Sequence, residues 1–356
     1  MLNIKIKSNI KDYQVIFIKD LTKQIHDLIT NYSTHFLVDI NIWKKYEKEL
    51  TQIKLAKSVK YFSAIEKNKT LVEVNEYIEF LLENNVQKKD KIIVIGGGLV
   101  QDIGSFTSHI IKRGIEWIFI PTTLLSMADS CIGSKSGINI GKYKNQVGSF
   151  HPPIEIYIYS GFLDTLLKND FINGIGEITK HALIKGGKAY SNLEKELEKI
   201  YSNKNAAEKI IFDSLLIKKE IVEEDELEKG IRKLLNYGHT FGHALEGYTK
   251  NKIPHGLGVL IGMDLANYIS MKRKLLTQQE FEKIHALLKK FISVKSIPIN
   301  NVDLYIKFLS TDKKVVENKV DAILCKGIGK IKIIRIVFDK ELNNNIQSYL
   351  KYFNHG

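Results

Sequence analysis

The sequence predicts an α/β N-terminal domain with a doubly wound parallel sheet, followed by a mostly α-helical C-terminal domain. Two observations predict this fold class. In the first half, short apolar segments rich in Ile and Val alternate with amphipathic helical segments. In the second half, amphipathic helical segments follow one another almost without interruption. The change falls near residue 165, so we expect domains at 1–165 and 166–356.

The predicted strands of the first half end in Asp, Gly or Pro, as buried parallel strands commonly do. The N-terminal stretch MLNIKIKSNIKDYQV also alternates polar and apolar residues like a strand. Between the strands, TLVEVNEYIEFLLENN (70–85) has the i, i+3, i+4 apolar pattern of a helix. The four clearest strand segments are HFLVDINI (35–42), KIIVIGGG (91–98), WIFIPTT (117–123) and IEIYIY (154–159).

The second half contains one strand signal among its helices. DAILCKGIGKIKIIRI (321–336) carries β-branched residues on both sides of Gly327–Gly329, which predicts a hairpin. The predicted helices are KAYSNLEKELEKIYSN (188–203), AAEKIIFDSLLIKKEIVEEDELEKG (206–230) and LTQQEFEKIHALLKKFI (276–292). We expect the C-terminal domain to be mostly helical.

The composition is that of a globular protein of 356 residues, 44% hydrophobic and 26% charged. Its 53 Lys and Arg against 40 Asp and Glu give a net charge of +13, but the lysines are spread along the chain. A small anionic substrate therefore explains the charge as well as nucleic acid does, and we predict no nucleic-acid partner. We also expect a cytoplasmic protein without membrane spans, signal peptide or disulfides, since Cys131 and Cys325 are its two cysteines.

The stretch VIGGGLVQDIGSF (94–106) follows a predicted strand and opens a predicted helix. Glycines at such a turn let backbone N–H groups approach a pyrophosphate at the helix N-terminus. The spacing differs from G-x-G-x-x-G, so ordinary turn chemistry is the competing interpretation. Asp39, at the end of an earlier strand, has the position of a carboxylate that accepts hydrogen bonds from ribose hydroxyls.

A long polar stretch, residues 120–153, separates two apolar strands. A loop of this length in a compact domain is more often functional than filler. Lysine and asparagine side chains on such a loop suit a phosphate or carboxylate ligand. Its candidate ligand-binding residues are Thr122, Thr123, Asp129, Lys135, Lys144 and Asn145.

The stretch NYGHTFGHALE (236–246) places His239 and His243 one helical turn apart, each preceded by a glycine. Bare backbone beside the imidazoles suits either a metal ion or a closely packed second helix. One carboxylate and imidazoles from separate helices form a familiar zinc set with an open position for substrate. The spacing does not choose among the five metal-ligand candidates, which are Glu177, His181, His239, His243 and His255.

Taken together, these motifs resemble those of the 3-dehydroquinate synthase family. Their order and spacing agree over about residues 35–336, and several motifs in register are more specific than any one of them. The matching motifs are GGG-x-x-x-D (96–102), PTTLL-x-x-x-DS-x-x-G-x-K (121–135), KN-x-x-G-x-F (144–150), G-x-x-E-x-x-K (174–180) and R-x-LLN-x-GH-T-x-GH-A (232–244).

The resemblance implies a Rossmann-like N-terminal domain, a helical C-terminal domain, NAD, and Zn²⁺ with Co²⁺ as an alternative metal. It implies metal ligands Glu177, His239 and His255, which leaves His181 without a role. The implied substrate-facing and catalytic residues are Asp129, Lys135, Asn145, Lys180, Lys218, Arg232, Asn236 and His243. The implied cofactor-binding residues are Asp39, Glu66, Lys69, Gly97, Gly98, Asp102, Thr122, Thr123, Lys144 and Thr165.

The resemblance also implies the reaction and the assembly. The expected substrate is 3-deoxy-arabino-heptulosonate 7-phosphate, which family members convert to 3-dehydroquinate and phosphate in the shikimate pathway. NAD oxidises the substrate transiently, phosphate is eliminated, the hydride returns, and an intramolecular aldol step closes the ring. Arg232 suits the substrate carboxylate and Lys135 its phosphate. Asp102 and Arg113 match positions that reach a neighbouring subunit's site, which implies a homodimer.

Several positions depart from the family pattern, and one of these departures is Lys142-Tyr143 in place of a Leu-Gly before Lys144-Asn145. Gln101 stands where the family usually has Gly, Ser134 replaces the second Gly of Gly-Gly-Lys, and Leu257 replaces the Glu of HGEAV. Leu257 removes a carboxylate two residues from a predicted metal ligand. Alternative functions are therefore another sugar phosphate cyclase acting on a heptulose or hexose phosphate, a zinc-dependent polyol dehydrogenase, or a catalytically idle protein on the same scaffold.

Overall fold

The structure is a computed structural model that describes residues 2–141, 143–310, 315–316 and 319–355. The chain forms two compact units, an α/β unit of Met1–Leu167 with Ala207–Glu228, and a mainly helical unit of Lys168–Ala206 with Lys229–Gly356. The predicted fold class is confirmed. The units differ from the predicted division at residue 165 mainly in that Ala207–Glu228 packs within the α/β unit.

The α/β unit is built on a seven-stranded sheet in the order β1-β2-β9-β6-β5-β3-β4. β1 pairs with β2 in antiparallel fashion, and the other strands are parallel. The inner strand β5 is apolar on both faces, and Ile92–Ile95 are fully buried there. The strands are β1 (Asn3–Ile6), β2 (Tyr13–Ile18), β3 (Thr34–Asp39), β4 (Ser58–Phe62), β5 (Lys91–Gly96), β6 (Trp117–Pro121) and β9 (Glu155–Tyr159).

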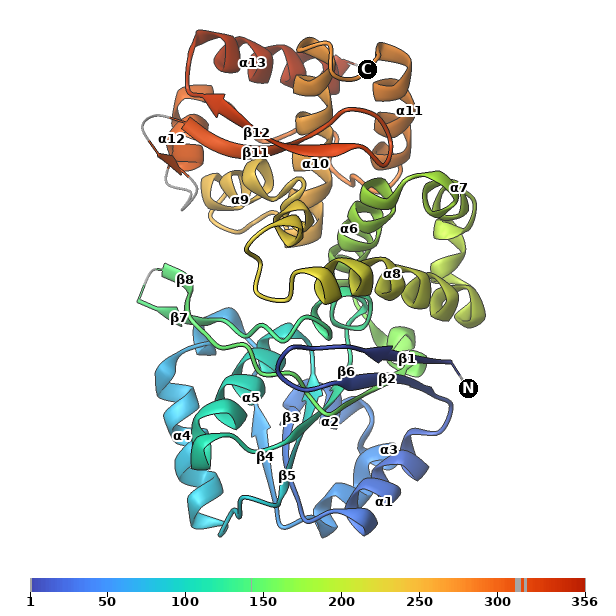
Figure 1. Cartoon of the computed structure of the whole chain (residues 1–356), viewed down its shortest axis with the longest axis vertical. Coiled ribbons are helices and arrows are strands. Elements are labelled where there is room, and N and C mark those ends of the chain that lie inside the picture. The colour runs from blue at the N-terminus through green and yellow to red at the C-terminus, as the bar shows by residue number, and fades with distance from the viewer. Residues whose placement is uncertain (1, 142, 311–314, 317–318, 356) are drawn as a thin grey trace. The chain divides into compact units, whose positions relative to one another are not determined.

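Helices cover both faces of this sheet, with α4 and α5 on one side and α1 and α3 on the other (Figure 1). Asp20 caps α1 by accepting a hydrogen bond from the Lys23 amide at 2.9 Å. The α-helices are α1 (Leu21–Asn31), α2 (Ile40–Lys45), α3 (Glu47–Leu50), α4 (Leu71–Glu83), α5 (Gly98–Ile110) and most of α8 (Lys204–Glu224). Short helical turns are η1 (Thr51–Leu55), η2 (Glu66–Asn68), η3 (Ile111–Arg113), η4 (Ser126–Ser130, a π-helix) and η5 (Ser160–Thr165).

The four clearest predicted strands are confirmed as β3, β5, β6 and β9, and the predicted helix at 70–85 is α4. Several elements of this unit were not predicted, among them the strands β4, β7 and β8. β4 has the sequence SVKYF and is half-exposed at the sheet edge, so it lacks a continuous apolar run. The predicted loop at 120–153 contains a small hairpin of β7 (Ile138–Ile140) and β8 (Tyr143–Val147), whose residues are mostly exposed or half-buried.

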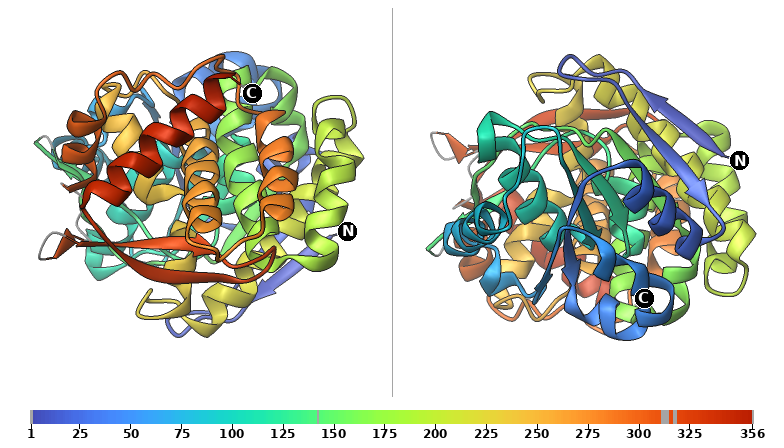
Figure 2. Two further views of the ribbon diagram at one scale, coloured as in Figure 1. Left: turned by 90° about the horizontal axis from the view of Figure 1, so that it is seen from above. Right: turned by 90° about the horizontal axis from the view of Figure 1, so that it is seen from below.

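The second unit packs its helices around α10 (His255–Lys272), in which every residue from Gly256 to Ser270 is buried. Figure 1 shows the predicted hairpin, now β11 (Lys319–Cys325) and β12 (Ile331–Val337), and Figure 2 shows α13 (Lys340–His355) in red. Its other elements are α6 (Lys168–Lys185), α7 (Gly187–Glu196), η6 (Leu197–Tyr201), η7 (Ile231–Asn236), α9 (His239–Tyr248), α11 (Gln278–Lys289), α12 (Val302–Ser310) and β10 (Val315–Val316).

Glycines let α9 and α10 cross with their backbones in contact. A Cβ at Gly242 would lie 2.7 Å from the carbonyl oxygen of Gly258, and one at Gly262 would lie 2.0 Å from that of Gly238. Gly238 also has a φ of 80°, which glycine adopts without strain. Close packing of a second helix, one of the two interpretations of the glycines before His239 and His243, is therefore confirmed.

The described residues contain no helix that is both long and apolar enough to span a membrane. Cys131 and Cys325 are both free and buried.

Candidate active site

The predicted cofactor residues of the α/β unit gather at the carboxyl ends of its parallel strands. Asp39 ends β3, Gly97 follows β5, Thr122 follows β6, and Thr165 ends the turn that follows β9. Neighbouring strands end level with each other, since Gly96 pairs with Pro121. In open α/β sheets this edge is where ligands bind.

The glycine turn after β5 leaves room for a ligand beside the first turn of α5. Gly97 is the N-cap residue and provides no side-chain cap, so side-chain capping does not satisfy the first N–H groups of the helix. A Cβ at Gly98 would meet no atom within 4 Å, whereas one at Gly97 would lie 2.9 Å from the Thr123 methyl carbon. Thr122 is fixed by its amide hydrogen bond to the Gly96 carbonyl at 3.0 Å. This is the open backbone surface that a pyrophosphate requires.

Lys69, Asp102 and Asn145 form one polar cluster, although they come from three separate segments. Lys69 Nζ donates to Asp102 Oδ2 at 2.9 Å and to Asn145 Oδ1 at 2.6 Å. Asp102 Oδ1 also accepts from the Gly137 amide at 2.9 Å. Burial raises the pKa of Asp102 in spite of Lys69. Glu66 reaches the same hairpin by accepting a hydrogen bond from Asn139 Nδ2 at 2.8 Å.

Two predicted substrate-facing lysines of the α/β unit form ion pairs. Lys218 Nζ lies 2.9 Å from Asp129 Oδ1 and donates to the Asp129 carbonyl at 2.6 Å. Lys218 is buried, so it is not a solvated surface lysine. Lys135 pairs with Glu228 and remains partly exposed. Lys144 is exposed on β8.

In the helical unit, Glu177 from α6 lies opposite two histidines from α9 and α10. Its Oε1 is 3.4 Å from His239 Nε2 and 3.3 Å from His255 Nε2. This buried oxygen accepts no hydrogen bond from the described part of the chain. Two ligands held about 2.1 Å from a tetrahedral metal ion are separated by about 3.4 Å, so both distances from Glu177 Oε1 match the ligand spacing of a zinc set.

The electrostatics of this cluster favour a cation. Burial alone would raise the pKa of Glu177, but Lys180 and His239 hold it well below its usual range. Burial lowers the pKa of His239, although Glu177 opposes this shift. Burial would also lower the pKa of His255, but the carboxylates of Glu177 and Glu246 raise it to about 10. The negative charges of Glu177 and Glu246 therefore attract a cation to this cluster. A bound metal ion would require its histidine ligands in the neutral form.

His243 lies close enough to define a second possible ligand set. One ring nitrogen from each of His239, His243 and His255 falls within 4.8 Å of the others. His243 is the exposed member of the three, and Glu177 has no part in this set. His181, one turn from Glu177 on α6, is fully buried.

The remaining predicted residues of the helical unit flank these ligands in sequence. Lys180 is buried and forms an ion pair with Glu177 within α6. Arg232 is buried in η7, so it is not an ordinary solvated cation. Asn236 ends η7 and donates to the Lys233 carbonyl at 3.2 Å.

Three of the departures from the family pattern are each accommodated locally, whereas Lys142 lies outside the described residues. Gln101 is buried and exchanges hydrogen bonds with Ser130, donating to its carbonyl at 2.7 Å and accepting from its hydroxyl at 2.6 Å. Ser134 donates to the buried carboxylate of Glu226 at 2.8 Å. Leu257 is buried in α10 as a core residue.

Two residues at these sites were not predicted. Tyr46 donates its hydroxyl to the Gly161 carbonyl at 2.9 Å and lies 3.0 Å from Thr165 Oγ1. Glu246 lies 2.9 Å from His255 Nδ1. Glu246 stands three residues after His243, and this helical spacing was the one available signal.

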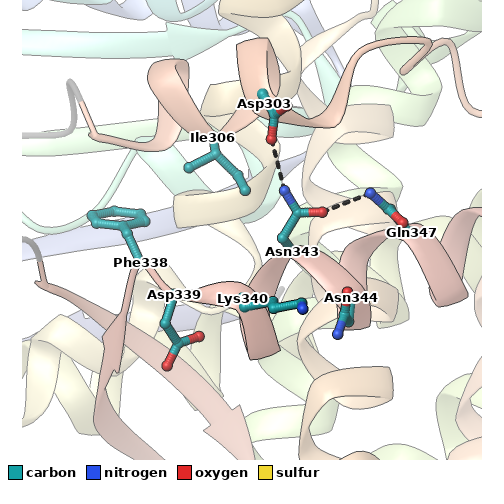
Figure 3. A pocket seen from close by; sticks show the side chains of 8 residues that line it. All are labelled: Asp303, Ile306, Phe338, Asp339, Lys340, Asn343, Asn344 and Gln347. Atoms are coloured by element: carbon teal, nitrogen blue, oxygen red, sulfur yellow. Dashed lines mark hydrogen bonds between the residues drawn. The ribbon is translucent and has the colours of Figure 1, made fainter.

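A groove beside the start of α13 lies apart from these residues in sequence and contains none of the predicted site residues (Figure 3). Its polar side chains bond to one another, since Asn343 donates to Asp303 at 2.7 Å and accepts from Gln347 at 2.7 Å.

Solved structures share the fold of the whole chain. A 2-deoxy-scyllo-inosose synthase, complexed with carbaglucose-6-phosphate, NAD⁺ and Co²⁺, aligns with a TM-score of 0.87 and 23% identity, covering 98% of this chain and 100% of that one. A 2-epi-5-epi-valiolone synthase from Streptomyces hygroscopicus subsp. jinggangensis, with NAD⁺ and Zn²⁺ bound, gives 0.85 and 24%, covering 96% and 97%. The architecture is therefore that of the sugar phosphate cyclases.

Sequence comparison defines the family. The 3-dehydroquinate synthase N-terminal model matches residues 60–173, and the 3-dehydroquinate synthase C-terminal model matches residues 174–315. The 3-dehydroquinate synthase of Pelagibacter ubique is 36% identical, with 97% of each chain covered. The chain belongs to the 3-dehydroquinate synthase family, as its motifs predicted.

Proposed function

We propose that this enzyme converts 3-deoxy-arabino-heptulosonate 7-phosphate to 3-dehydroquinate and phosphate, using NAD and a divalent metal. The observation that carries the metal dependence is the buried Glu177 oxygen, which faces the nitrogens of His239 and His255. Family membership supports the reaction. The NAD⁺ and Zn²⁺ or Co²⁺ named for the two related cyclases support the cofactors.

Glu177, His239 and His255 would hold Zn²⁺, with Co²⁺ as an alternative. When bound, the metal would polarise the substrate's alcohol oxygen and lower the pKa of that alcohol. Lys180 keeps Glu177 ionised, since its charge offsets the cost of burying a carboxylate. The absence of a hydrogen bond to Glu177 Oε1 from the described residues leaves that oxygen available for coordination.

NAD would bind at the carboxyl edge of the sheet. Gly97 and Gly98 would place backbone N–H groups against its pyrophosphate, and Asp39 would accept hydrogen bonds from a ribose. When bound, NAD would accept and later return one hydride, which acidifies the proton that must leave before phosphate elimination. The further contacts in this proposal are Glu66, Lys69, Asp102, Thr122, Thr123, Lys144 and Thr165.

The proposed substrate carries two anionic groups, a carboxylate and a phosphate, and different cationic side chains would bind each of them. Arg232 would bind the carboxylate in bidentate fashion, and Lys135 would contact the phosphate. Lys218 is held by Asp129, so its donors have a fixed direction. Asn145, Lys180, Asn236 and His243 complete the proposed substrate-binding and catalytic set.

We further propose a cytoplasmic homodimer acting in the shikimate pathway, in which Arg113 lies near the partner subunit's site. Arg113 has a φ of 57° beside Gly114, so the chain turns sharply there.

The test of this function is a parallel assay of inorganic phosphate release from the carboxylated heptulosonate phosphate and from neutral heptulose and hexose phosphates. Turnover of the carboxylated substrate supports dehydroquinate synthesis. Turnover of a neutral sugar phosphate alone would instead assign the chain to another cyclase activity. Leu257 is the residue that motivates this comparison, because the family usually has a carboxylate at its position.

A further inference from the structure

The two ring nitrogens of His255 have different partners. Nε2 lies 3.3 Å from Glu177 Oε1, on the side of the proposed metal. Nδ1 lies 2.9 Å from Glu246 Oε1, which comes from the last turns of α9. The distance of 2.9 Å between Nδ1 and Glu246 Oε1 is that of a good hydrogen bond. Glu246 therefore contacts the ring nitrogen of His255 that does not face Glu177.

The packing of α9 against α10 leaves space for this carboxylate. A Cβ at Gly258 would lie 3.3 Å from Glu246 Oε1 and 3.4 Å from its Cγ, which is tighter than ordinary contact. The Glu246 side chain is only 14% exposed. A nearly buried carboxyl group is therefore held against one imidazole.

We propose that Glu246 is a positioning residue for His255. A carboxylate on Nδ1 keeps the proton there, which leaves the Nε2 lone pair directed toward Glu177 and the metal. Such a partner also fixes the ring orientation and raises the basicity of the ligand. This inference rests on the proposed metal site.

The test measures metal binding by Glu246→Ala, Glu246→Gln and a control. Each protein is stripped of metal, and Co²⁺ affinity is then measured by competition with a chromophoric chelator, together with the visible spectrum of the bound Co²⁺. The control is Glu198→Ala, which removes an exposed glutamate that is paired with Lys290 at 3.0 Å in the same unit. Thermal unfolding of the metal-free proteins checks that folding is retained.

We expect Glu246→Ala to bind Co²⁺ about 10–100-fold more weakly and to alter its spectrum. Glu246→Gln should lose less affinity, because the amide oxygen still accepts a hydrogen bond from Nδ1. Glu198→Ala should match the wild-type protein. Wild-type affinity and spectrum in both Glu246 variants would overturn this inference and leave the metal site standing. A wild-type protein that binds no Co²⁺ would overturn the proposed metal site itself.

Discussion

Oε1 of Glu177 lies 3.4 Å from Nε2 of His239, although the two residues stand on different helices. His239 follows Gly238 directly, and a Cβ at Gly262 would lie 2.0 Å from the Gly238 carbonyl oxygen, so His239 begins α9 at its tight crossing with α10. Gly238 therefore allows α9 to pack closely against α10. The adjacent imidazole of His239 contributes to the cluster with Glu177 and His255.

The first prediction separates the two possible histidine sets. His239→Ala should lose its metal on dialysis, because His239 is a ligand in the proposed Glu177 set. His243→Ala should retain metal, because His243 is assigned to the substrate. Metal content per protein is measured by atomic emission. Loss of metal from His243→Ala with retention by His239→Ala would reverse the assignment.

The second prediction concerns the crossing of α9 and α10. Gly262→Ala should destabilise the helical unit by about 1–3 kcal/mol, since its Cβ would lie 2.0 Å from the Gly238 carbonyl oxygen. Gly98→Ala is the matched control, because its Cβ would meet nothing within 4 Å. Urea unfolding of the metal-free and NAD-free proteins measures the difference. Equal stability of the two variants would refute the packing role of Gly262.

The third prediction is a pH dependence of stability in the α/β unit. Burial lowers the pKa of His35 below 6.5, although Asp90 lies 3.1 Å from its Nε2. The unfolded chain therefore binds a proton at higher pH than the folded chain, and stability falls as the pH drops below 6.5. His35→Gln removes this contribution. The melting temperature of the variant should therefore fall less than that of the wild type between pH 7.5 and pH 5.5, which lie about one unit on either side of the ordinary histidine pKa of about 6.5. An equal fall in both proteins would show that His35 does not contribute.

The fourth prediction places the substrate carboxylate. Arg232→Ala should lose about 1.5–3 kcal/mol of binding to the carboxylated substrate, since a charged hydrogen-bond partner is removed. The penalty should be smaller for a neutral sugar phosphate. Lys233→Ala is the control, because Lys233 is an exposed neighbour. The penalty is measured as the loss in kcat/KM for each substrate. Equal losses for both substrates would show that Arg232 does not bind the carboxylate.

The sequence predicted those features that depend on local pattern. The strand at 91–96 was predictable because Ile92–Ile95 form a continuous apolar run that ends at a glycine turn. β4 was missed because Lys60 and Tyr61 interrupt its apolar pattern at the sheet edge. The hairpin of β7 and β8 was missed because its residues are mostly exposed, so no buried face marks its strands.

The candidate site was predictable only in part, for a similar reason. Glu177 and His181 are one helical turn apart, so spacing alone does not decide which one faces the histidines. The crossing of three helices makes that choice, and it brings Oε1 of Glu177 toward both His239 and His255. The role of Glu246 depends on the same crossing, because its partner His255 begins the next helix.

The most direct test of the central claim is the yield of phosphate per NAD. The enzyme, loaded with metal and given far less NAD than 3-deoxy-arabino-heptulosonate 7-phosphate, is followed for inorganic phosphate and for absorbance of reduced nicotinamide. Because the hydride is returned in each cycle, we predict many phosphates released per NAD without accumulation of NADH. Accumulation of NADH in proportion to product would contradict the account and indicate a dehydrogenase.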